Sequence, residues 1–501
     1  MSNDDLNADL FTQVHPPDWR TPTPTGRYNL VVIGAGTAGL VSAAGAAGLG
    51  AKVALIERGL MGGDCLNTGC VPSKALLRSA HVAASVRDAD RFGVRVPAGT
   101  QVDFPAVMER LRRMRTAIAP NDSAARFASL GVDVYFGEAT FVSPDAIEVG
   151  GTRLDFRAAV IATGARPAIP QIPGMYEAVC LTSENVFSLT ELPARLAVIG
   201  GGPIGCELAQ AFARCGSQVT LFQAGPRLLP RDEPDAARLI ATALEHDGVR
   251  LLLSSRIERI ESTASGRAIH YAFDSTGSTH VEADAILVAA GRTANIEGLN
   301  LQAAAVLSDP RHGVIVDEHL RTTNRRIFAA GDVCSAMKFT HAADFQARIV
   351  IQNALFRGRA RASSLIIPWC TYTDPEVAHI GLTEAEAKQR GVAIRTFTQP
   401  LHEVDRARLE GAEEGFVRIH VRAGSDRIVG ATIVAPHAGD LIGEVSLAMT
   451  ARIGLKKLAQ AIHPYPTLAD ALRRTGDAYN RTRLTPFVKG LFERWLRWQR
   501  W

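Results

Sequence analysis

A strand, a glycine-rich turn and a helix occur in the same order twice in this chain. The first copy reads YNLVVIGAGTAGLVSAAGAAGLG and continues into AKVALIE, and the second reads RLAVIGGGPIGCELAQAFARCGSQVTLFQ. Each begins with an apolar run typical of a buried parallel strand, and small residues then recur at helical spacing. The repeat therefore predicts two dinucleotide-binding units of one α/β design.

The first glycine-rich turn has the residues that a bound dinucleotide requires. Gly34 permits the tight turn, Gly36 lets a pyrophosphate approach the backbone, and Gly39 allows close packing of helix on strand. The helix then presents unpaired N–H groups to the phosphates. Glu57 follows Gly39 by 18 residues and ends the next strand, where a carboxylate can accept both ribose hydroxyls. A turn without a ligand is the alternative, and the strand, helix and acid together argue against it.

The second turn contains Gly200, Gly202 and Gly205, but the residue 18 positions further on is Gln223 rather than an acid. A carboxylate there favours NADH and repels a 2′-phosphate, whereas a neutral amide does neither strongly. Arg227 is near enough in sequence to reach such a phosphate, and it is equally compatible with a solvated surface residue. The sequence therefore leaves the choice between NADH and NADPH open.

Two cysteines five positions apart follow the first unit, in the run GGDCLNTGCVPSK at residues 62–74. The helical pattern after this run places Cys70 just before or within the first turn of a helix, which lowers a thiol pKa and favours thiolate. A thiolate can donate electron density to an oxidised flavin, and a Cys65–Cys70 disulfide can accept electrons from a reduced one. Two structural cysteines or half a zinc site are the alternatives, but no second Cys/His pair has partner spacing.

Length and charge narrow the function further. The chain has 501 residues, enough for about three domains, and a net charge of +4, which argues against nucleic acid as the main partner. Seven cysteines do not suggest a disulfide scaffold, and the polar, acidic start does not resemble a secretory signal. We therefore expect a cytoplasmic, reducing location, where a disulfide is expected to be catalytic.

Residues 62–74 resemble the redox-disulfide signature of the class I pyridine nucleotide-disulfide oxidoreductases, which include dihydrolipoyl dehydrogenase, glutathione reductase and mercuric reductase. Both glycine-rich turns, Ala162-Thr163-Gly164 and Ala330-Gly331-Asp332 match this family in order. The resemblance covers residues 28–480 and implies FAD on the first unit and NADH or NADPH on the second. Thr163, Gly164 and Gly291, each at or just after the end of an apolar strand, are expected among the cofactor-binding residues.

The resemblance also implies roles for individual side chains. Cys70 would face the flavin and Cys65 would meet the substrate, while Asp332 would hydrogen-bond the ribityl chain. Lys74 and Glu207 match positions that pair beside the flavin N5, where the lysine stabilises negative charge on reduced flavin. Ordinary charges on helix surfaces are the alternative for these two residues.

The last domain departs from the family pattern. In the family, His-Pro-Thr-x-x-Glu supplies the acid/base, but this chain reads HPYPTLAD from His463 to Asp470. Aligned on Pro-Thr, Tyr465 replaces the histidine and Asp470 the glutamate, and a tyrosine with a pKa of about 10 is a poor base at neutral pH. The tyrosine resembles mercuric-reductase-like members, yet their C-terminal cysteine pair is missing because no cysteine follows Cys370.

The resulting expectation is a homodimeric α/β flavoprotein with two Rossmann-like domains and a C-terminal α+β dimerisation domain. Its parts are an extended arm at 1–27, an FAD domain at 28–173 and 294–364, an NAD(P) domain at 174–293, a dimerisation domain at 365–480, and a basic aromatic tail at 481–501. No resident metal is expected.

Three functions remain open at this point. The first is reduction of a soft metal ion, in the manner of mercuric reductase, or of a disulfide acceptor. The second is a dihydrolipoyl dehydrogenase or glutathione reductase activity, which Tyr465 argues against. The third is a membrane-docked electron donor to a protein partner, suggested by aromatic and basic residues alternating within 484–501. For that tail, a helix packed on the dimer surface or a frayed end is the alternative.

Overall fold

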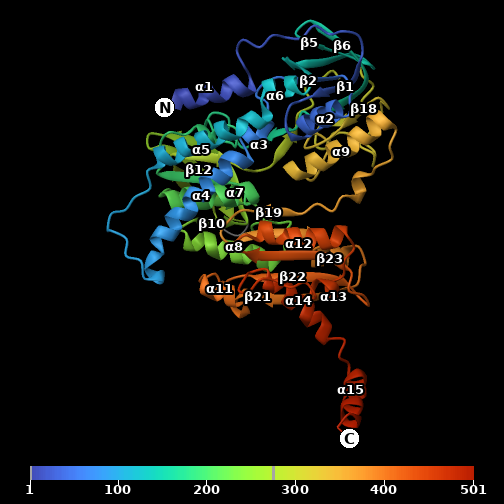
Figure 1. Cartoon of the computed structure of the whole chain (residues 1–501). Coiled ribbons are helices and arrows are strands. Elements are labelled where there is room, and N and C mark those ends of the chain that lie inside the picture. The colour runs from blue at the N-terminus through green and yellow to red at the C-terminus, as the bar shows by residue number, and fades with distance from the viewer. Residues whose placement is uncertain (1–2, 274–276, 501) are drawn as a thin grey trace. The chain divides into compact units, whose positions relative to one another are not determined.

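The computed structural model describes residues 3–273 and 277–500 (Figure 1). The chain divides into two compact units. The first unit gathers the residues up to 200 together with 211–222 and 255–365. The second gathers 201–210, 223–254 and the residues from 366 onward.

The first unit is built on a seven-stranded sheet with the order β3-β2-β1-β6-β5-β4, in which β18 also pairs with β6. Strands β3, β2, β1, β6 and β18 run parallel, and Val32 of β1 lies between Leu55 and Val160. Most of their side chains are apolar and buried, as expected for a sheet covered on both faces, and most of the exposed polar ones lie on β6. The strands are β1 (Tyr28–Ile33), β2 (Val53–Glu57), β3 (Val132–Phe136), β4 (Ala139–Ser143), β5 (Ala146–Val149), β6 (Thr152–Ile161) and β18 (Ile327–Ala329).

Helices α2 (Thr37–Gly48) and α9 (Thr340–Phe356) pack side by side in this unit (Figure 1). The small side chains of α2, such as Ala38, Ala43 and Ala46, are buried and allow this close packing. The other helices of the unit are α3 (Gly63–Asn67), α4 (Cys70–Arg87), α5 (Phe104–Ile118) and α6 (Ala124–Ser129).

The expectation of an extended N-terminal arm is wrong for part of its length, because Asn3–Val14 form helix α1. Leu10 and Val14 are one helical turn apart and are 1% and 0% exposed, so their burial against the core stabilises the helix. The Pro-rich residues 15–27 contain no helix or strand. Trp19 anchors them by donating its indole N–H to the Val134 carbonyl at 2.9 Å.

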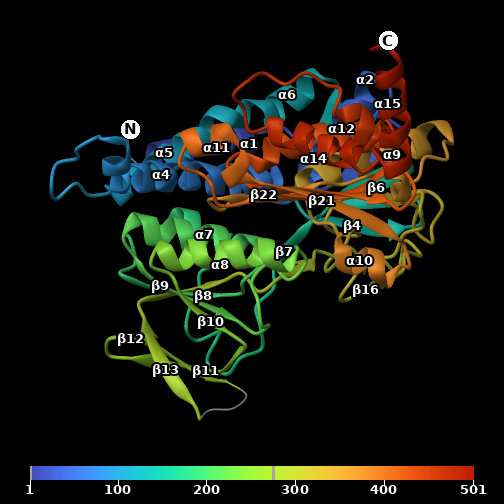
Figure 2. The ribbon, with the colours of Figure 1, turned by 90° about the horizontal axis from the view of Figure 1, so that it is seen from below.

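The second copy of the strand–turn–helix design begins at β8, which pairs in parallel with β9 and β14. Beside it in the first unit is an antiparallel sheet, β11-β12-β13, whose strands lie next to one another in Figure 2. Two short antiparallel pairs, β7 with β15 and β16 with β17, complete the strands of this unit. The bounds are β7 (Ala165–Pro167), β8 (Arg195–Ile199), β9 (Gln218–Gln223), β11 (Ser255–Thr263), β12 (Gly266–Phe273), β13 (Thr279–Ala283), β14 (Ala285–Val288), β15 (Arg292–Ala294), β16 (Ser308–Asp309) and β17 (Gly313–Val314).

The second unit has an antiparallel sheet with the order β19-β20-β23-β22-β21. Helices α12 and α14 contact it, and one core contains residues of both the sheet and these helices. The strands are β19 (Trp369–Thr371), β20 (Glu376–Gly381), β21 (Ile394–Pro400), β22 (Phe416–Arg422), β23 (Ile428–Ala435) and β10 (Arg250–Leu253). The helices are α8 (Pro234–His246), α10 (Glu384–Gln389), α11 (Asp405–Leu409), α12 (Ala438–Thr450), α13 (Leu455–Leu458), α14 (Asp470–Arg481) and α15 (Pro486–Trp498), and α7 (Pro203–Cys215) begins in this unit.

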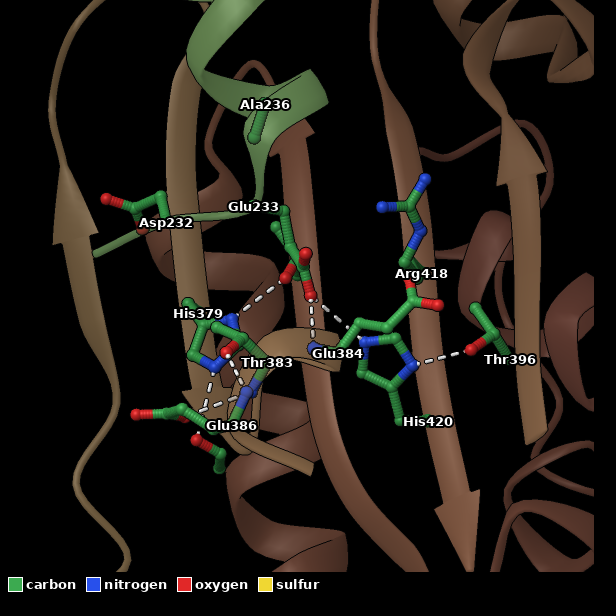
Figure 3. Close-up of polar contacts among 12 residues, drawn as sticks. Asp232, Glu233, Ala236, His379, Thr383, Glu384, Glu386, Thr396, Arg418 and His420 are labelled. Carbon is green, nitrogen blue, oxygen red and sulfur yellow. Dashed lines mark hydrogen bonds and ion pairs between the residues drawn. The ribbon is translucent and has the colours of Figure 1, made fainter. Parts of the chain in front are cut away.

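A buried polar network joins residues 223–254 to the sheet of this second unit (Figure 3). The Glu233 carboxylate accepts the backbone N–H of Glu384 at 2.8 Å and lies 3.3 Å from His420 Nε2. The Thr396 hydroxyl lies 2.8 Å from the other ring nitrogen of His420. Each buried polar group therefore has a partner, which offsets the cost of removing it from water.

The tail predicted at 481–501 forms the end of α14 and the helix α15, with Trp501 outside the described residues. None of the α15 residues is buried, and Figure 1 shows the helix standing apart from the sheet of its own unit. Within the part of the chain described, no helix combines the length and the apolar character needed to cross a bilayer.

Candidate active site

The two cysteines of residues 62–74 lie on consecutive helices. Cys65 is in the middle of α3, and Cys70 is the first residue of α4, as its sequence context predicts. Cys65 is half-buried and Cys70 is exposed. A hydrogen bond between the two thiols is the main cause that raises the pKa of Cys65, and burial adds to it. The Cys65 thiol therefore keeps its proton to a higher pH than an ordinary cysteine does.

A third side chain reaches this pair from a distant part of the sequence. The Thr340 hydroxyl lies 3.5 Å from Cys70 Sγ, and Thr340 is the first residue of α9. Cys70 therefore lies at the N-terminus of one helix and next to the N-terminus of another. Both helix dipoles have their positive ends at this sulfur, which stabilises negative charge there.

The first glycine-rich turn connects β1 to α2 at the carboxyl edge of the parallel sheet. Gly34 has a φ of +99°, and a Cβ on it would lie 2.4 Å from the Ala162 carbonyl oxygen, so no other residue fits. A Cβ on Gly39 would lie 1.8 Å from the Gly34 oxygen. At Gly36 such a Cβ would lie 3.7 Å from the Gly63 Cα, an ordinary van der Waals contact.

The Glu57 carboxylate closes this turn from the end of β2. Its two oxygens accept the backbone N–H groups of Ala35 and Gly59, each at 2.7 Å. Burial raises the pKa of Glu57, although these two donors oppose the shift. The acid is therefore held rigidly beside the turn, where a ribose can donate to its remaining lone pairs.

Asp332 follows β18 at the same edge of the sheet. Arg292 Nε lies 3.4 Å from its carboxylate, and Lys338 donates to its backbone carbonyl at 2.6 Å. Burial raises the pKa of Asp332, while the charges of Arg292 and Lys338 oppose this shift. Arg292 also pairs with Asp64, the residue before Cys65.

Thr163, Gly164 and Gly291 connect neighbouring strand ends. Thr163 donates its hydroxyl to the Asn295 carbonyl at 2.6 Å, and Asn295 returns a side-chain N–H to the Thr163 carbonyl at 2.9 Å. The Gly164 and Gly291 carbonyls accept the backbone N–H groups of Asn295 and Ala168, each at 3.0 Å. These contacts tie β7 to β15 beside Cys65, Arg292 and Asp332.

The residues present at this edge fit a bound dinucleotide. Helix α2 presents its N-terminus at this edge, and two carboxylates, Glu57 and Asp332, lie at the carboxyl ends of the parallel strands β2 and β18. Among the described residues, the buried Oδ1 of Asn67, two positions after Cys65, has no hydrogen-bond partner. Such an orphaned acceptor beside the cysteine pair is suited to a polar N–H of a flavin nucleotide.

In the second unit, the side-chain amide of Gln223 closes the second glycine-rich turn as Glu57 closes the first. Gln223 Oε1 accepts the backbone N–H of Gly201 at 2.9 Å, the counterpart of the Glu57–Ala35 contact. Arg227 donates to the carbonyls of Asp232 and Pro230 at 2.9 and 2.7 Å. A Cβ at Gly202 would meet nothing within 4 Å, so its backbone is open, and Gly205 follows in the first turn of α7.

The residues predicted as acid/base each have their own partner. His463 Nε2 lies 3.0 Å from Glu444 Oε1, and Tyr465 donates to Asp405 Oδ2 at 3.1 Å, a contact that raises the pKa of Tyr465. Asp470 pairs with Arg473 and Arg474 at 2.8 and 2.6 Å. The carboxylate beside His463 is therefore that of Glu444, and not that of Asp470, which aligns with the glutamate of the family motif.

Lys74 and Glu207 belong to different units. Lys74 lies on α4, four positions after Cys70. Glu207 is buried on α7 and accepts the backbone N–H of Tyr372 at 2.9 Å. Their pairing beside a flavin stays a prediction.

Four residues of the site were not predicted from the sequence: Arg292, Lys338, Thr340 and Glu444. Arg292 directly follows Gly291, a predicted cofactor-binding residue, so its position in the sequence could have indicated it. No local sequence pattern indicates Thr340 or Glu444, because each reaches its partner only through tertiary packing.

Comparison with known proteins identifies the family. The profile for pyridine nucleotide-disulphide oxidoreductases matches residues 28–347, and the profile for the dimerisation domain of these proteins matches residues 367–475. Mercuric reductase from Staphylococcus aureus is 35% identical over 448 residues, which cover 89% of this chain and 82% of that protein. Dihydrolipoyl dehydrogenase from Chlamydia muridarum is 33% identical and covers 88% of this chain and 95% of that protein.

The solved structures give the same result. The Cu(II) complex of the HOCl-induced flavoprotein disulfide reductase RclA from Escherichia coli superposes with a TM-score of 0.80 and 28% identity, over 91% of this chain and 100% of that chain. The order of motifs, the thiol pair at the edge of the sheet and these matches agree. This chain belongs to the pyridine nucleotide-disulphide oxidoreductases, a family of FAD-dependent enzymes that use NAD(P)H.

Proposed function

We propose that this enzyme passes electrons from NAD(P)H through FAD to a Cys65–Cys70 disulfide, and from the resulting dithiol to a soft metal ion or a disulfide acceptor. The observation that carries the proposal is the hydrogen-bonded thiol pair at the start of α4. Two thiols in such contact form a disulfide when they lose two electrons and two protons, and the disulfide takes them up again when it is reduced.

Bound FAD supplies the two-electron step between NAD(P)H and the disulfide. Cys70 is the sulfur proposed to face the flavin, because two helix N-termini and the Thr340 hydroxyl stabilise its negative charge. Cys65 keeps its proton until it attacks the acceptor or binds a metal ion. Asp332 and Glu57 are proposed to hold the ribityl and ribose hydroxyls.

A soft metal ion is the acceptor class that we favour. Thiolate pairs bind soft metals well, and such an acceptor needs no protein acid/base during exchange. An exposed Tyr465 in place of the family histidine agrees with this view. The similarity to mercuric reductase and to a protein solved with Cu(II) supports the same class.

Dithiol exchange of the dihydrolipoyl dehydrogenase type is the second candidate, and the His463–Glu444 contact favours it. A carboxylate 3.0 Å from Nε2 fixes the orientation of the imidazole, as acid/base catalysis requires. The two candidates separate in one assay series. If the enzyme turns over Hg(II) or Cu(II) and His463→Gln retains this activity, the result supports metal-ion reduction. If the enzyme turns over lipoamide and His463→Gln loses this activity, the result supports dithiol exchange.

The pair Lys74 and Glu207 is proposed to stabilise reduced flavin, in the arrangement that the family resemblance implies. We also propose that the chain forms a homodimer through its dimerisation domain, with His463 and Tyr465 of one subunit completing the site of the other. The domain limits at 173, 293 and 364 are part of this proposal. Size-exclusion chromatography with light scattering tests the dimer.

Peripheral membrane contact through residues 484–501 is proposed separately, because every described residue of α15 is accessible. Phe487, Leu491 and Trp495 lie four residues apart on a helix that also carries Lys489, Arg494 and Arg497. Co-sedimentation with anionic vesicles should fall when 484–501 are deleted. Unchanged co-sedimentation would exclude this role.

A further inference from the structure

A cavity of about 770 Å³ lies in the first unit, away from the glycine-rich turns. Arg27 and Arg157 line it from the segment before β1 and from β6. Arg27 immediately precedes β1 and Arg326 immediately precedes β18, so these two lining residues place the cavity at the amino edge of the parallel strands. Gly34 and Asp332 follow the same strands at the opposite edge.

The cavity is therefore separate from the nucleotide site. Strand β1 has six residues and spans about 20 Å between the two edges. Nucleotides bind at the carboxyl edge of such sheets. An occupant of the cavity is thus an additional ligand.

Arginines dominate the lining of this cavity. Arg321, Arg325 and Arg326 come from the segment that leads into β18. Arg357, Arg359 and Arg361 come from the segment after α9. With Arg27 and Arg157, segments far apart in sequence bring eight guanidinium groups to one concave site, although the net charge of the whole chain is only +4.

Few carboxylates balance these charges. Asp145 pairs with Arg27 at 2.9 Å and with Arg326 at 3.6 Å. Glu318 pairs with Arg361 at 3.5 Å. A third carboxylate, Asp317, accepts backbone N–H groups of His319 and Arg321.

The other arginines of the cavity lack such partners. In the described ranges, no carboxylate lies within 4.0 Å of the guanidinium groups of Arg157, Arg325, Arg357 or Arg359. The buried Nε of Arg321 also has no hydrogen-bond partner among the described residues. Positive charge and unused donors thus remain for a ligand.

The geometry points to a small ligand that carries several phosphate groups. Guanidinium groups bind phosphate through paired N–H donors, and clustered arginines suit multiply charged anions. The volume falls within the range of about 300–1,000 Å³ that is typical of small-molecule sites. Two aromatic rings line the cavity: Phe328 is 2% exposed and offers no face on which a base could stack, and the His319 ring is 22% exposed and lies 3.0 Å through Nδ1 from the Ala360 carbonyl oxygen. We propose that the cavity binds an oligophosphate chain, either free or carried by a nucleotide.

Calorimetric titration of the FAD-loaded enzyme with inorganic tripolyphosphate tests this site, at about 0.15 M salt. The variant Arg325→Ala/Arg357→Ala/Arg359→Ala removes three exposed arginines without breaking an ion pair. We expect it to weaken binding by at least about tenfold. The matched control, Arg91→Ala/Arg95→Ala/Arg113→Ala, removes the same charge elsewhere on the first unit and should change binding less than about twofold.

Two further arms identify the source of the phosphates. ATP is titrated while excess NAD⁺ and NADP⁺ occupy the dinucleotide site. Tighter binding of ATP than of tripolyphosphate would show that a nucleotide carries the phosphate groups, and equal or weaker binding would show that the ligand is free oligophosphate. Both results support the site.

Three results would overturn the proposal. One is the absence of tripolyphosphate binding to the loaded enzyme. Another is an equal loss of binding in both triple variants. The third is a DNA duplex that binds more tightly than tripolyphosphate and loses affinity in the Arg325 variant only, which would assign the surface to nucleic acid. Flavin absorbance and NAD(P)H oxidation of each variant verify that it is folded.

Discussion

The Thr340 hydroxyl lies 3.5 Å from the sulfur of Cys70, although 270 positions separate the two residues in sequence. This contact places the N-terminus of α9 next to the N-terminus of α4. The reactive sulfur therefore receives a hydroxyl donor and two helix dipoles at once, and none of these depends on a charged side chain.

Removing that hydroxyl should make the Cys70 thiolate harder to form. A hydrogen bond to a charged group contributes about 1.5–3 kcal/mol, so Thr340→Val should raise the pH at which the thiolate forms by about one to two units. Ultraviolet thiolate absorbance followed against pH measures this shift. Thr340→Ser keeps the hydroxyl and should behave like the native enzyme. An unshifted titration in Thr340→Val would show that the contact does not stabilise the thiolate.

The two active-site thiols should differ in their reactivity toward alkylating agents. Cys70 is exposed, whereas the hydrogen bond to Cys70 and burial raise the pKa of Cys65. Because the thiolate is the nucleophile, iodoacetamide should label Cys70 first at neutral pH in the reduced, flavin-free protein, by about tenfold or more. Peptide mass spectrometry after brief labelling of that protein measures the ratio. Preferential labelling of Cys65 in the flavin-free protein would show that Cys65, and not Cys70, is the more acidic thiol.

Glu57 should determine how tightly the enzyme holds FAD. Glu57→Ala removes the acceptor for the Ala35 and Gly59 N–H groups and the proposed ribose contacts, and should weaken FAD binding by about 10- to 100-fold. Glu57→Gln copies Gln223 at the second turn and should retain more flavin than Glu57→Ala. Flavin released on dilution, measured by fluorescence, compares the two. Equal retention by both variants would remove Glu57 from the FAD site.

Acid should destabilise the second unit through His379. This side chain is fully buried, and burial lowers its pKa to about 4, below the value of about 6.5 for an unfolded chain. The unfolded chain therefore binds a proton first as the pH falls from 6.5 to 4, so the free energy of unfolding decreases in that window by up to about 3 kcal/mol.

Denaturation curves at pH 7.5 and 4.5 measure this effect. His379→Gln should reduce the difference between the two curves, and His246→Gln, at an exposed histidine of the same unit, should leave it unchanged. Although burial opposes it, the hydrogen bond to His420 lowers the pKa of Glu233, so some acid sensitivity remains below about pH 4.5 in every variant. An identical pH dependence in His379→Gln would contradict the assignment to His379.

Features with a short sequence spacing were predictable. The strand, turn and helix around Gly34, the acid at Glu57 and the position of Cys70 in the first turn of a helix all follow from local patterns, and the structure agrees with them. The helix α1 was not expected because its acidic, polar sequence has little helical patterning, and burial of Leu10 and Val14 in the core stabilises it.

Features that depend on tertiary packing were not predictable in this way. Aligning Asp470 with the family glutamate suggested a partner for the acid/base, but Asp470 bonds to Arg473 and Arg474, and His463 contacts Glu444 on α12. The arginine cavity is similar, since Arg27, Arg157, Arg326 and Arg359 are scattered in sequence and only the sheet brings them together. A sequence pattern does not show which residues distant in sequence lie close together in space.

The number of thiols per chain, counted before and after anaerobic reduction with NADH or NADPH, tests the central claim most directly. We predict that the oxidised yellow enzyme gains two thiols per chain on reduction, that a long-wavelength absorbance band appears with them, and that Cys70→Ser abolishes both changes. A colourless protein, an unchanged thiol count, or a band that persists in Cys70→Ser would contradict electron transfer through this cysteine pair.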